Sequence, residues 1–118
     1  MKILNNLTGS YVEKENLFTT LTPLIQINSQ LKFDIGRHCV IKNNEELYLS
    51  SQEFKILYLL CMNIGKTLTK QELIKFADLT NRSPLYVHIN KLREKIEDDP
   101  SNPRLIITER GKGYKLLV

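Results

Sequence analysis

Two hydrophobic periods follow one another along the chain, and they predict different elements. Residues 24–27 and 31–35 alternate between apolar and polar side chains, and two more short apolar runs follow at 39–41 and 47–49. Turn residues separate the runs, and a period of two is typical of half-buried strands. This segment therefore predicts a small antiparallel meander.

Helical spacing begins at residue 50 and returns after residue 69. Ser50 and Glu53 have the spacing of a capping box, in which each side chain binds the backbone N–H of the other residue, and Thr69 and Glu72 repeat it. Gly65 suits the left-handed position that often follows a helix end. The side chains expected on the buried faces are Phe54, Leu57, Leu60 and Cys61 in the first helix, and Leu73, Ile74 and Ala77 in the second.

A third helix, predicted over residues 83–97, has a narrow apolar stripe. Ser83 is a good N-cap, and Pro84 is tolerated at the first helical position, where an N–H would have no partner. Steps of three and four residues place one set on the inward side: Leu85, Ile89, Leu92 and Ile96. The opposite side presents Val87, Asn90, Lys91 and Glu94, flanked by Tyr86, His88, Arg93 and Lys95.

The last apolar runs predict a hairpin. Residues 105–108 and 114–118 have strand character, and Gly111 and Gly113 lie in the connection between them. Glycine is favoured where a tight turn needs positive φ, which we expect at both glycines.

Composition fits a single folded domain of ordinary type. With 42% hydrophobic and 25% charged residues, one domain is expected at residues 24–118, and residues 1–23 read as an N-terminal arm or linker remnant. Within that arm, Ser10 and Glu13 have capping-box spacing, and Pro23 breaks any helix. Apolar stretches fall short of the ~20 residues of a membrane span, and no secretory signal is evident. Because Cys39 and Cys61 lie in apolar runs as reduced thiols, a cytoplasmic location is expected.

The excess of positive charge favours a polyanionic partner, and the sequence offers no recognisable catalytic or metal site. The net charge is +4, and residues 82–118 hold eight Lys and Arg against five Asp and Glu. The Gly65-Lys66-Thr67 segment ends like a phosphate-binding loop but lacks the earlier glycine that such a loop needs. His38 and Cys39 would point to opposite faces of a strand, and no acid, base and nucleophile combine. We therefore expect no enzyme, no metal and no cofactor.

Four segments carry a resemblance to a known family. They are LSSQEFKILYLL, TLTKQELI, VHINKLREKIEDDP and ITERGKGYKL, in that order, within residues 24–118. Together they resemble the effector domain of OmpR/PhoB-type response regulators, the output half of two-component systems. The resemblance implies an α+β winged helix-turn-helix, with an N-terminal four-stranded antiparallel sheet, three helices and a C-terminal β-hairpin wing.

The resemblance also implies a sequence-specific DNA-binding transcription regulator. Residues 83–97 would be the recognition helix in the major groove, and residues 108–114 the wing at the minor groove. The implied contacts are Val87, Asn90, Lys91 and Glu94 to bases, Ser83, His88 and Arg93 near phosphates, and Thr108, Arg110 and Lys112 in the wing. Lysine suits guanine, asparagine suits adenine, and arginine suits a narrow minor groove, so the residue types agree with these roles. Tyr86 is equally compatible with a groove contact and with covering the edge of the core.

Departures from the family pattern affect the expected partners. The usual receiver domain is not in the sequence, so we expect either an excised effector half or a stand-alone regulator. Asp78 stands where a tryptophan is common and a short loop follows, Arg82 lies one place earlier than the usual arginine, and Tyr86 replaces an acidic residue. The implied partners are double-stranded DNA, RNA polymerase and a second copy on direct-repeat half-sites. The alternative is a winged-helix protein-interaction module without specific DNA binding.

Overall fold

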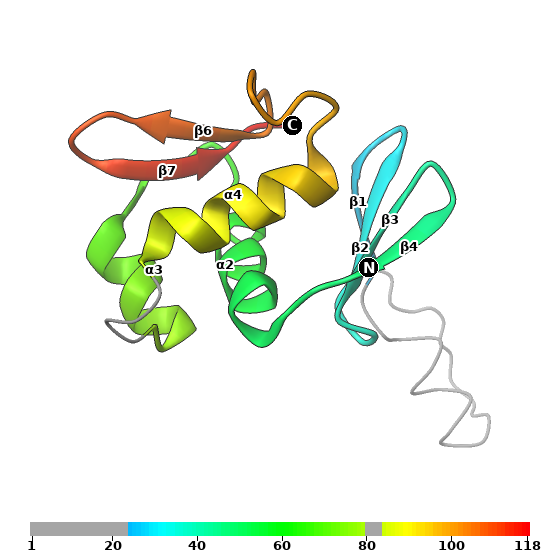
Figure 1. The fold of residues 1–118 in the computed structure, drawn as a ribbon, viewed down its shortest axis with the longest axis horizontal. Helices are drawn as coiled ribbons and strands as arrows, with labels where there is room; N and C mark the ends of the chain where they lie inside the picture. Colours follow the sequence, from blue (N-terminus) through cyan, green and yellow to red (C-terminus); the bar gives the residue numbers. More distant parts are fainter. Residues whose placement is uncertain (1–23, 80–83) are drawn as a thin grey trace, which may run out of the picture.

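The structure, a computed structural model, describes residues 24–79 and 84–118, which form two sheets and three helices (Figure 1). The strands are β1 (Leu24–Asn28), β2 (Leu31–Asp34), β3 (Cys39–Lys42), β4 (Glu45–Tyr48), β5 (Leu68–Thr69), β6 (Ile106–Glu109) and β7 (Gly113–Leu116). The helices are α2 (Ser51–Cys61), α3 (Lys70–Ala77) and α4 (Leu85–Ile96). The capping box predicted at Ser10 and Glu13, the break at Pro23, and residues Arg82 and Ser83 lie outside the described residues.

The N-terminal sheet is the meander predicted from the alternating runs. Its strand order is β1-β2-β3-β4, and each strand pairs antiparallel with the next one along the chain. Asn43 and Asn44 make the turn between β3 and β4 with φ of 50° and 69°, a region that asparagine tolerates better than most residues. Leu31, Phe33 and Val40 are buried, so one face of this sheet packs onto the helices. The predicted antiparallel meander is confirmed.

Both predicted capping boxes are present. The Ser50 hydroxyl accepts from the Glu53 N–H at 3.1 Å, and the Glu53 carboxylate accepts from the Ser50 N–H at 3.0 Å. In α3 the corresponding distances between Thr69 and Glu72 are 3.0 and 2.8 Å. These bonds satisfy N–H groups that the first turn of each helix would otherwise leave without partners. Asp78 ends α3 in the left-handed conformation, with φ of 56°.

The core lies where the three helices meet the two sheets. The predicted stripe of α4 (Leu85, Ile89, Leu92 and Ile96) is buried, and so are Cys39 and Cys61 as free thiols. The prediction for Ile74 is wrong: α3 buries Leu73 and Ala77, which are four residues apart, and leaves Ile74 40% exposed. The sequence reading also missed Ile56 and Glu53, which are both buried in α2.

The second sheet contains a strand that the sequence reading did not find. Its order is β5-β7-β6, and Leu68 and Thr69 of β5 pair with Tyr114 and Gly113 of β7. Gly111 has the predicted positive φ, at 79°, but Gly113 does not. A Cβ on Gly113 would lie 1.8 Å from the Leu68 carbonyl oxygen. Gly113 is therefore needed because β5 approaches it closely. Of the two glycines, only Gly111 adopts the positive φ that was predicted for both.

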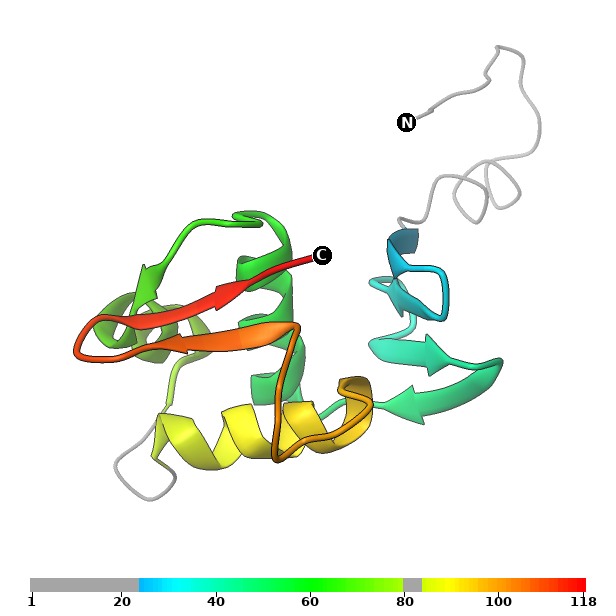
Figure 2. The same ribbon diagram turned by 90° about the horizontal axis from the view of Figure 1, so that it is seen from above.

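The arrangement places α4 along one side of the molecule, with the β6-β7 hairpin beside it. Seen from above, β6 lies nearer to α4 than β7 does, and α2 lies behind them (Figure 2). The described architecture is thus a four-stranded sheet, three helices and a C-terminal hairpin, which confirms the predicted α+β class. Among the described helices, none has both the length and the apolar character that crossing a membrane requires.

Candidate nucleic-acid interface

The start of α4 differs from its prediction by one residue. The N-cap is Pro84, whose φ of −58° and ψ of 151° are those of extended backbone, and the helix begins at Leu85. The predicted start at Ser83, with Pro84 already helical, is therefore wrong. The Pro84 carbonyl accepts the first bond, from the Val87 N–H at 3.0 Å. The fixed φ of proline suits both a helical residue and an N-cap, so residue types alone did not separate the two.

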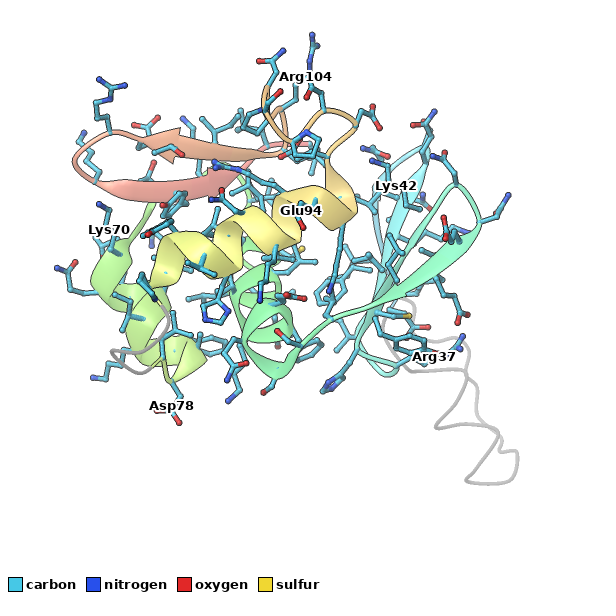
Figure 3. The ribbon with its side chains drawn as sticks, viewed as in Figure 1. Arg37, Lys42, Lys70, Asp78, Glu94 and Arg104 are labelled. Carbon is cyan, nitrogen blue, oxygen red and sulfur yellow. The ribbon has the colours of Figure 1, made fainter. Side chains whose placement is uncertain are left out.

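The side of α4 opposite the buried stripe is open to solvent. Asn90, Lys91 and Glu94 are exposed, Tyr86 is 59% exposed, and Val87 is half-buried. Glu94 points away from the core on the outward side of the helix (Figure 3). This outward face offers an amide, an ammonium and a carboxylate within about one turn, which are groups that can hydrogen-bond to base edges in a major groove. The exposure of Tyr86 does not favour the view that it covers the core edge.

Arg93 is held by the hairpin. Its Nη2 donates to the Ile106 carbonyl oxygen at 2.8 Å and to the Thr108 Oγ1 at 2.9 Å. The guanidinium also lies over the Tyr114 ring, 5.9 Å from its centroid, in cation–π geometry. Its Nε is buried and has no hydrogen-bond partner among the described residues. The arginine predicted near phosphates is thus already engaged between α4 and β6.

A second cation of α4 is also used internally. Lys95 Nζ lies 2.6 Å from the Glu53 carboxylate and donates to the Tyr48 carbonyl oxygen at 2.9 Å. The Glu53 side chain is almost fully buried, so its charge needs this partner as well as the Ser50 N–H. These contacts join the recognition-helix candidate to α2 and β4, and they remove one positive charge from the outward face.

His88 is placed at the edge of the interior. The residue is half-buried, and its Nε2 is inaccessible to solvent and has no hydrogen-bond partner among the described residues. The predicted phosphate contact of His88 remains a prediction.

The hairpin tip carries exposed positive charge. Arg110, Gly111 and Lys112 form the connection, closed by a bond of 2.9 Å from the Lys112 N–H to the Glu109 carbonyl oxygen. Glu109 pairs with Lys115 at 3.0 Å, and this contact lowers the pKa of the Glu109 carboxyl. Neither Arg110 nor Lys112 forms an ion pair with a described residue. Both predicted wing cations are thus displayed at the tip.

The base of the hairpin is fixed by a carboxylate that the sequence reading overlooked. Glu97, at the C-cap of α4, is only 4% exposed. Its oxygens accept from the backbone N–H groups of Arg104 at 2.8 Å, Leu105 at 3.1 Å and Ile106 at 2.8 Å. The available signal was spacing: Glu97 is four residues after Arg93, so both charged side chains border the same edge of the apolar stripe.

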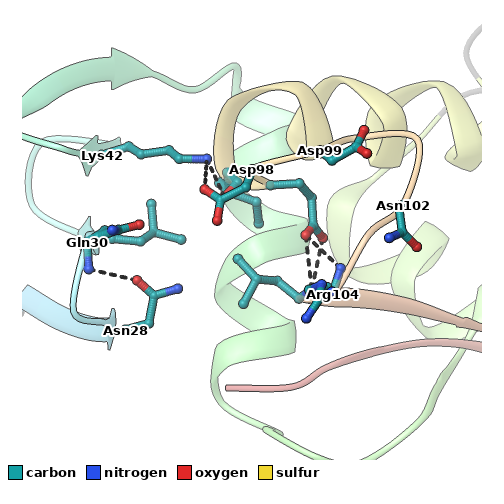
Figure 4. A pocket seen from close by; sticks show the side chains of 11 residues that line it. Asn28, Gln30, Lys42, Asp98, Asp99, Asn102 and Arg104 are labelled. Atoms are coloured by element: carbon teal, nitrogen blue, oxygen red, sulfur yellow. Dashed lines mark hydrogen bonds and ion pairs between the residues drawn. The ribbon is translucent and has the colours of Figure 1, made fainter.

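A pocket of about 490 Å³ lies elsewhere, between the N-terminal sheet and the turn after α4 (Figure 4). Lys42 reaches across it to the Ile96 carbonyl oxygen and to the Asp98 carboxylate, both at 3.1 Å. On the sheet side, Asn28 accepts from the Gln30 N–H at 2.8 Å. Since these polar groups bind one another, the pocket is a polar seam between two parts of the fold, and we assign no ligand to it.

Comparisons with known proteins agree with this architecture. The family described as "Transcriptional regulatory protein, C terminal" matches residues 44–116. The probable transcriptional regulator ycf27 of Galdieria sulphuraria is 42% identical over 92 residues, which cover 71% of this chain and 35% of that protein. Across the first curated relatives, the chain spans 35–40% of their length.

Two solved structures extend the similarity to three dimensions. Response regulator DrrB, an OmpR/PhoB homolog of Thermotoga maritima, is similar with a TM-score of 0.72 and 33% identity, over 80% of this chain and 44% of that one. The DNA-binding domain of RstA from Klebsiella pneumoniae, solved in complex with the RstA box, gives a TM-score of 0.68 and 28% identity, over 80% and 96% of the two chains. The family match spans more than half of the chain and concerns regulators of transcription and not enzymes. The chain therefore belongs to the C-terminal domain family of transcriptional regulatory proteins and has the OmpR/PhoB-type winged-helix fold that its sequence resembles.

Proposed function

We propose that residues 24–118 bind double-stranded DNA in a sequence-specific manner, with α4 in the major groove and the hairpin at the minor groove. The observation that carries this proposal is the pair of surfaces on one side of the fold: the outward face of α4, with Asn90, Lys91 and Glu94 exposed, and the hairpin tip. The similar RstA domain was solved in complex with its DNA box, which supports the same use of this fold.

Each exposed side chain has a chemical role in this proposal. Lys91 donates to guanine O6 and N7, and Asn90 pairs with adenine N6 and N7. Glu94 accepts from the cytosine N4 amino group, and the half-buried Val87 contacts a thymine methyl group. At the other site, Arg110 enters an A·T-rich minor groove, whose narrow walls concentrate negative potential, and Lys112 lies near the backbone.

The phosphate contacts are fewer than the sequence alone indicated. Thr108 keeps a hydroxyl hydrogen to donate. The contacts of His88 and of Ser83, which lies outside the described residues, with the DNA backbone stay predictions. Arg93 and Lys95 are engaged inside the protein, so few cations of α4 remain to neutralise phosphates. A single copy should therefore bind weakly, and two copies on direct-repeat half-sites about ten base pairs apart give useful affinity.

The proposal also includes a cellular location and a second partner. We place the protein in the cytoplasm, where DNA and RNA polymerase are both accessible, and we assign residues 1–23 to an arm or linker outside the DNA-binding unit. We expect RNA polymerase to bind the surface near the connection between α3 and α4. Asp78, exposed at the end of α3, would give that contact a different character from the tryptophan common in the family.

Selection from a randomised DNA pool tests the proposal. The chain should enrich a defined motif, and its affinity for that motif should fall only moderately as salt rises from about 50 to 200 mM, because each phosphate contact releases counterions and this surface makes few of them. Lys91→Ala should flatten the preference at one base pair. Lys32→Ala is the matched control, since Lys32 is exposed on the N-terminal sheet, and it should leave the preference unchanged. Failure to enrich any motif would contradict sequence-specific binding.

The protein-interaction alternative gains no separate support. An acidic residue on the groove face and the modest net charge of +4 leave room for it, but Glu94 is explained equally well as a cytosine reader. If the selection returns no motif while charge reversal of Lys91 and Arg110 leaves the cellular activity intact, the alternative replaces the proposal.

A further inference from the structure

We propose that Arg93 and Glu97 form a clamp on β6 that fixes the angle between the recognition helix and the wing, so that Arg93 serves DNA reading as a positioning residue. The inference rests on the proposed DNA-binding function and adds a role that differs from a phosphate contact.

β6 is the edge strand of its sheet, because the strand order is β5-β7-β6. The Leu117 N–H donates to the Leu105 carbonyl oxygen at 2.8 Å, so Leu105 faces β7. In an antiparallel ladder, alternate residues direct their backbone groups to alternate sides. The N–H and C=O of Ile106 therefore point to the open edge, where a strand at the margin of a sheet has no neighbour.

The clamp satisfies both of these open-edge groups. The Glu97 carboxylate accepts from the Ile106 N–H at 2.8 Å, and Arg93 Nη2 donates to the Ile106 carbonyl oxygen at 2.8 Å. Glu97 at the C-cap of α4 and Arg93 within the helix thus replace the acceptor and the donor that an adjacent strand would supply. Bonds in which one partner is ionised are shorter and stronger than neutral ones, so two such contacts hold β6 against α4.

The clamp extends to the wing through Thr108. Arg93 Nη2 also donates to Thr108 Oγ1 at 2.9 Å, and Thr108 is exposed to solvent. A hydroxyl that accepts one bond still has its own hydrogen to donate. That hydrogen cannot point at Arg93 and stays available for another partner, two residues before Arg110 at the hairpin tip.

The geometry restricts a direct phosphate contact for Arg93. Nη2 is shared between two acceptors, and Nε is inaccessible to solvent. Only the N–H groups of Nη1 could reach a phosphate with the β6 contacts intact, and a phosphate bond through Nη2 would cost the hairpin its fixed angle. Positioning and phosphate binding therefore make opposite predictions for how Arg93 and Arg110 combine.

A double-mutant cycle separates the two roles. Binding to the selected DNA is measured for the wild type, Arg93→Gln, Arg110→Ala and the double variant. Arg110→Ala should weaken binding about ten-fold in the wild type but less than about two-fold in Arg93→Gln, because the wing is already misplaced. The slope of affinity against salt should be the same in Arg93→Gln and in the double variant, because the misplaced wing no longer brings Arg110 to the DNA. If the two effects multiply and the salt slope falls by about one more in the double variant, Arg93 contacts a phosphate and the proposal is overturned.

Two further variants serve as controls for folding. Thr108→Val retains the arginine and removes one acceptor, so the same cycle can be run with it if Arg93→Gln does not fold. Lys115→Gln breaks the ion pair with Glu109 inside the hairpin and does not touch α4. In the Lys115→Gln background, Arg110→Ala should keep its full effect of about ten-fold.

The free protein gives a readout that does not depend on DNA. Amide hydrogen exchange of Ile107 and Glu109, which pair with β7, should be faster in Arg93→Gln and Thr108→Val than in the wild type while α2 keeps its protection. Unchanged exchange would overturn the clamp. If the wild type binds no DNA but exchange responds as expected, the proposed function fails and the structural clamp stands.

Discussion

Replacing Glu97 with alanine should be among the most destabilising single changes in this domain. Its carboxylate accepts three backbone N–H groups from the segment that leads into β6. Of these bonds, the one from Ile106 is buried, and those from Arg104 and Leu105 are part-buried. The alanine variant leaves all three donors without their charged acceptor.

The magnitude follows from how much water can reach each donor. The buried Ile106 N–H loses its partner outright, at a cost of about 1–3 kcal/mol, and each part-buried N–H group finds water at a cost of about 0.5–1 kcal/mol. The free energy of unfolding should therefore fall by about 2–5 kcal/mol. Glu97→Gln keeps the shape and one oxygen but sets an amide N–H₂ against a backbone N–H, so we expect about 1–2 kcal/mol.

Urea denaturation followed by circular dichroism measures these differences. Asp98→Asn is the matched control, because this neighbouring carboxylate is 83% exposed and Lys42 is its one ion-pair partner among the described residues. It should change the free energy of unfolding by less than about 0.5 kcal/mol. The expected order of loss is Glu97→Ala, then Glu97→Gln, then Asp98→Asn. An alanine variant that is as stable as Asp98→Asn would refute the view that this carboxylate organises the turn.

Three shorter predictions concern other parts of the molecule. Lys91→Ala should weaken binding to the preferred DNA by about 1–3 kcal/mol and relax the preference at one base pair, as measured with single-base variants. Burial raises the pKa of the Cys61 thiol to about 12, so a thiol reagent at pH 8 should label Cys61 only in denaturant, and rapid labelling of the native protein would contradict this burial. Gly113→Ala should prevent folding or cost several times more than Gly111→Ala in thermal melts. The first change drives a methyl group into the Leu68 carbonyl, whereas the second costs only about 1–2 kcal/mol for an alanine at positive φ.

Local signals in the sequence were sufficient where a few adjacent residues decide the structure. The two capping boxes and the buried stripe of α4 were predicted correctly, because each depends on residue types at fixed short spacing. The meander followed from alternation and turn residues in the same way. Together with the four family segments, these features predicted the α+β fold class correctly.

The missed features depend on contacts between distant parts of the chain. β5 has only two residues, and it exists because Leu68 and Thr69 lie beside β7. Ile74 was assigned to the core because it is apolar, but the neighbours of α3 cover only the stripe of Leu73 and Ala77. Hydrophobic periodicity shows which residues share a side of a helix, and it does not show how wide a stripe the neighbouring elements cover.

In the candidate site, too, features set by local spacing were predicted and features set by distant contacts were missed. The exposure of Asn90, Lys91 and Glu94 followed from helical spacing. The internal bonds of Arg93 and Lys95 did not, because they require β6 and the buried Glu53 to lie within reach. Charged residues beside an apolar stripe are therefore candidates for contacts within the protein as well as for contacts with a ligand.

This use of charge affects how the domain would discriminate between DNA sequences. Of the three cations in α4, only Lys91 is exposed, and Glu94 adds a negative charge to the same face. Attraction to phosphates supplies most non-specific binding, so a face with little net positive charge binds random DNA weakly. Hydrogen bonds to base edges, by contrast, act only on the matching sequence. Holding Arg93 and Lys95 inside the protein therefore lowers non-specific affinity more than specific affinity. The ratio between the two affinities, which decides how a regulator is distributed over a genome, increases as a result.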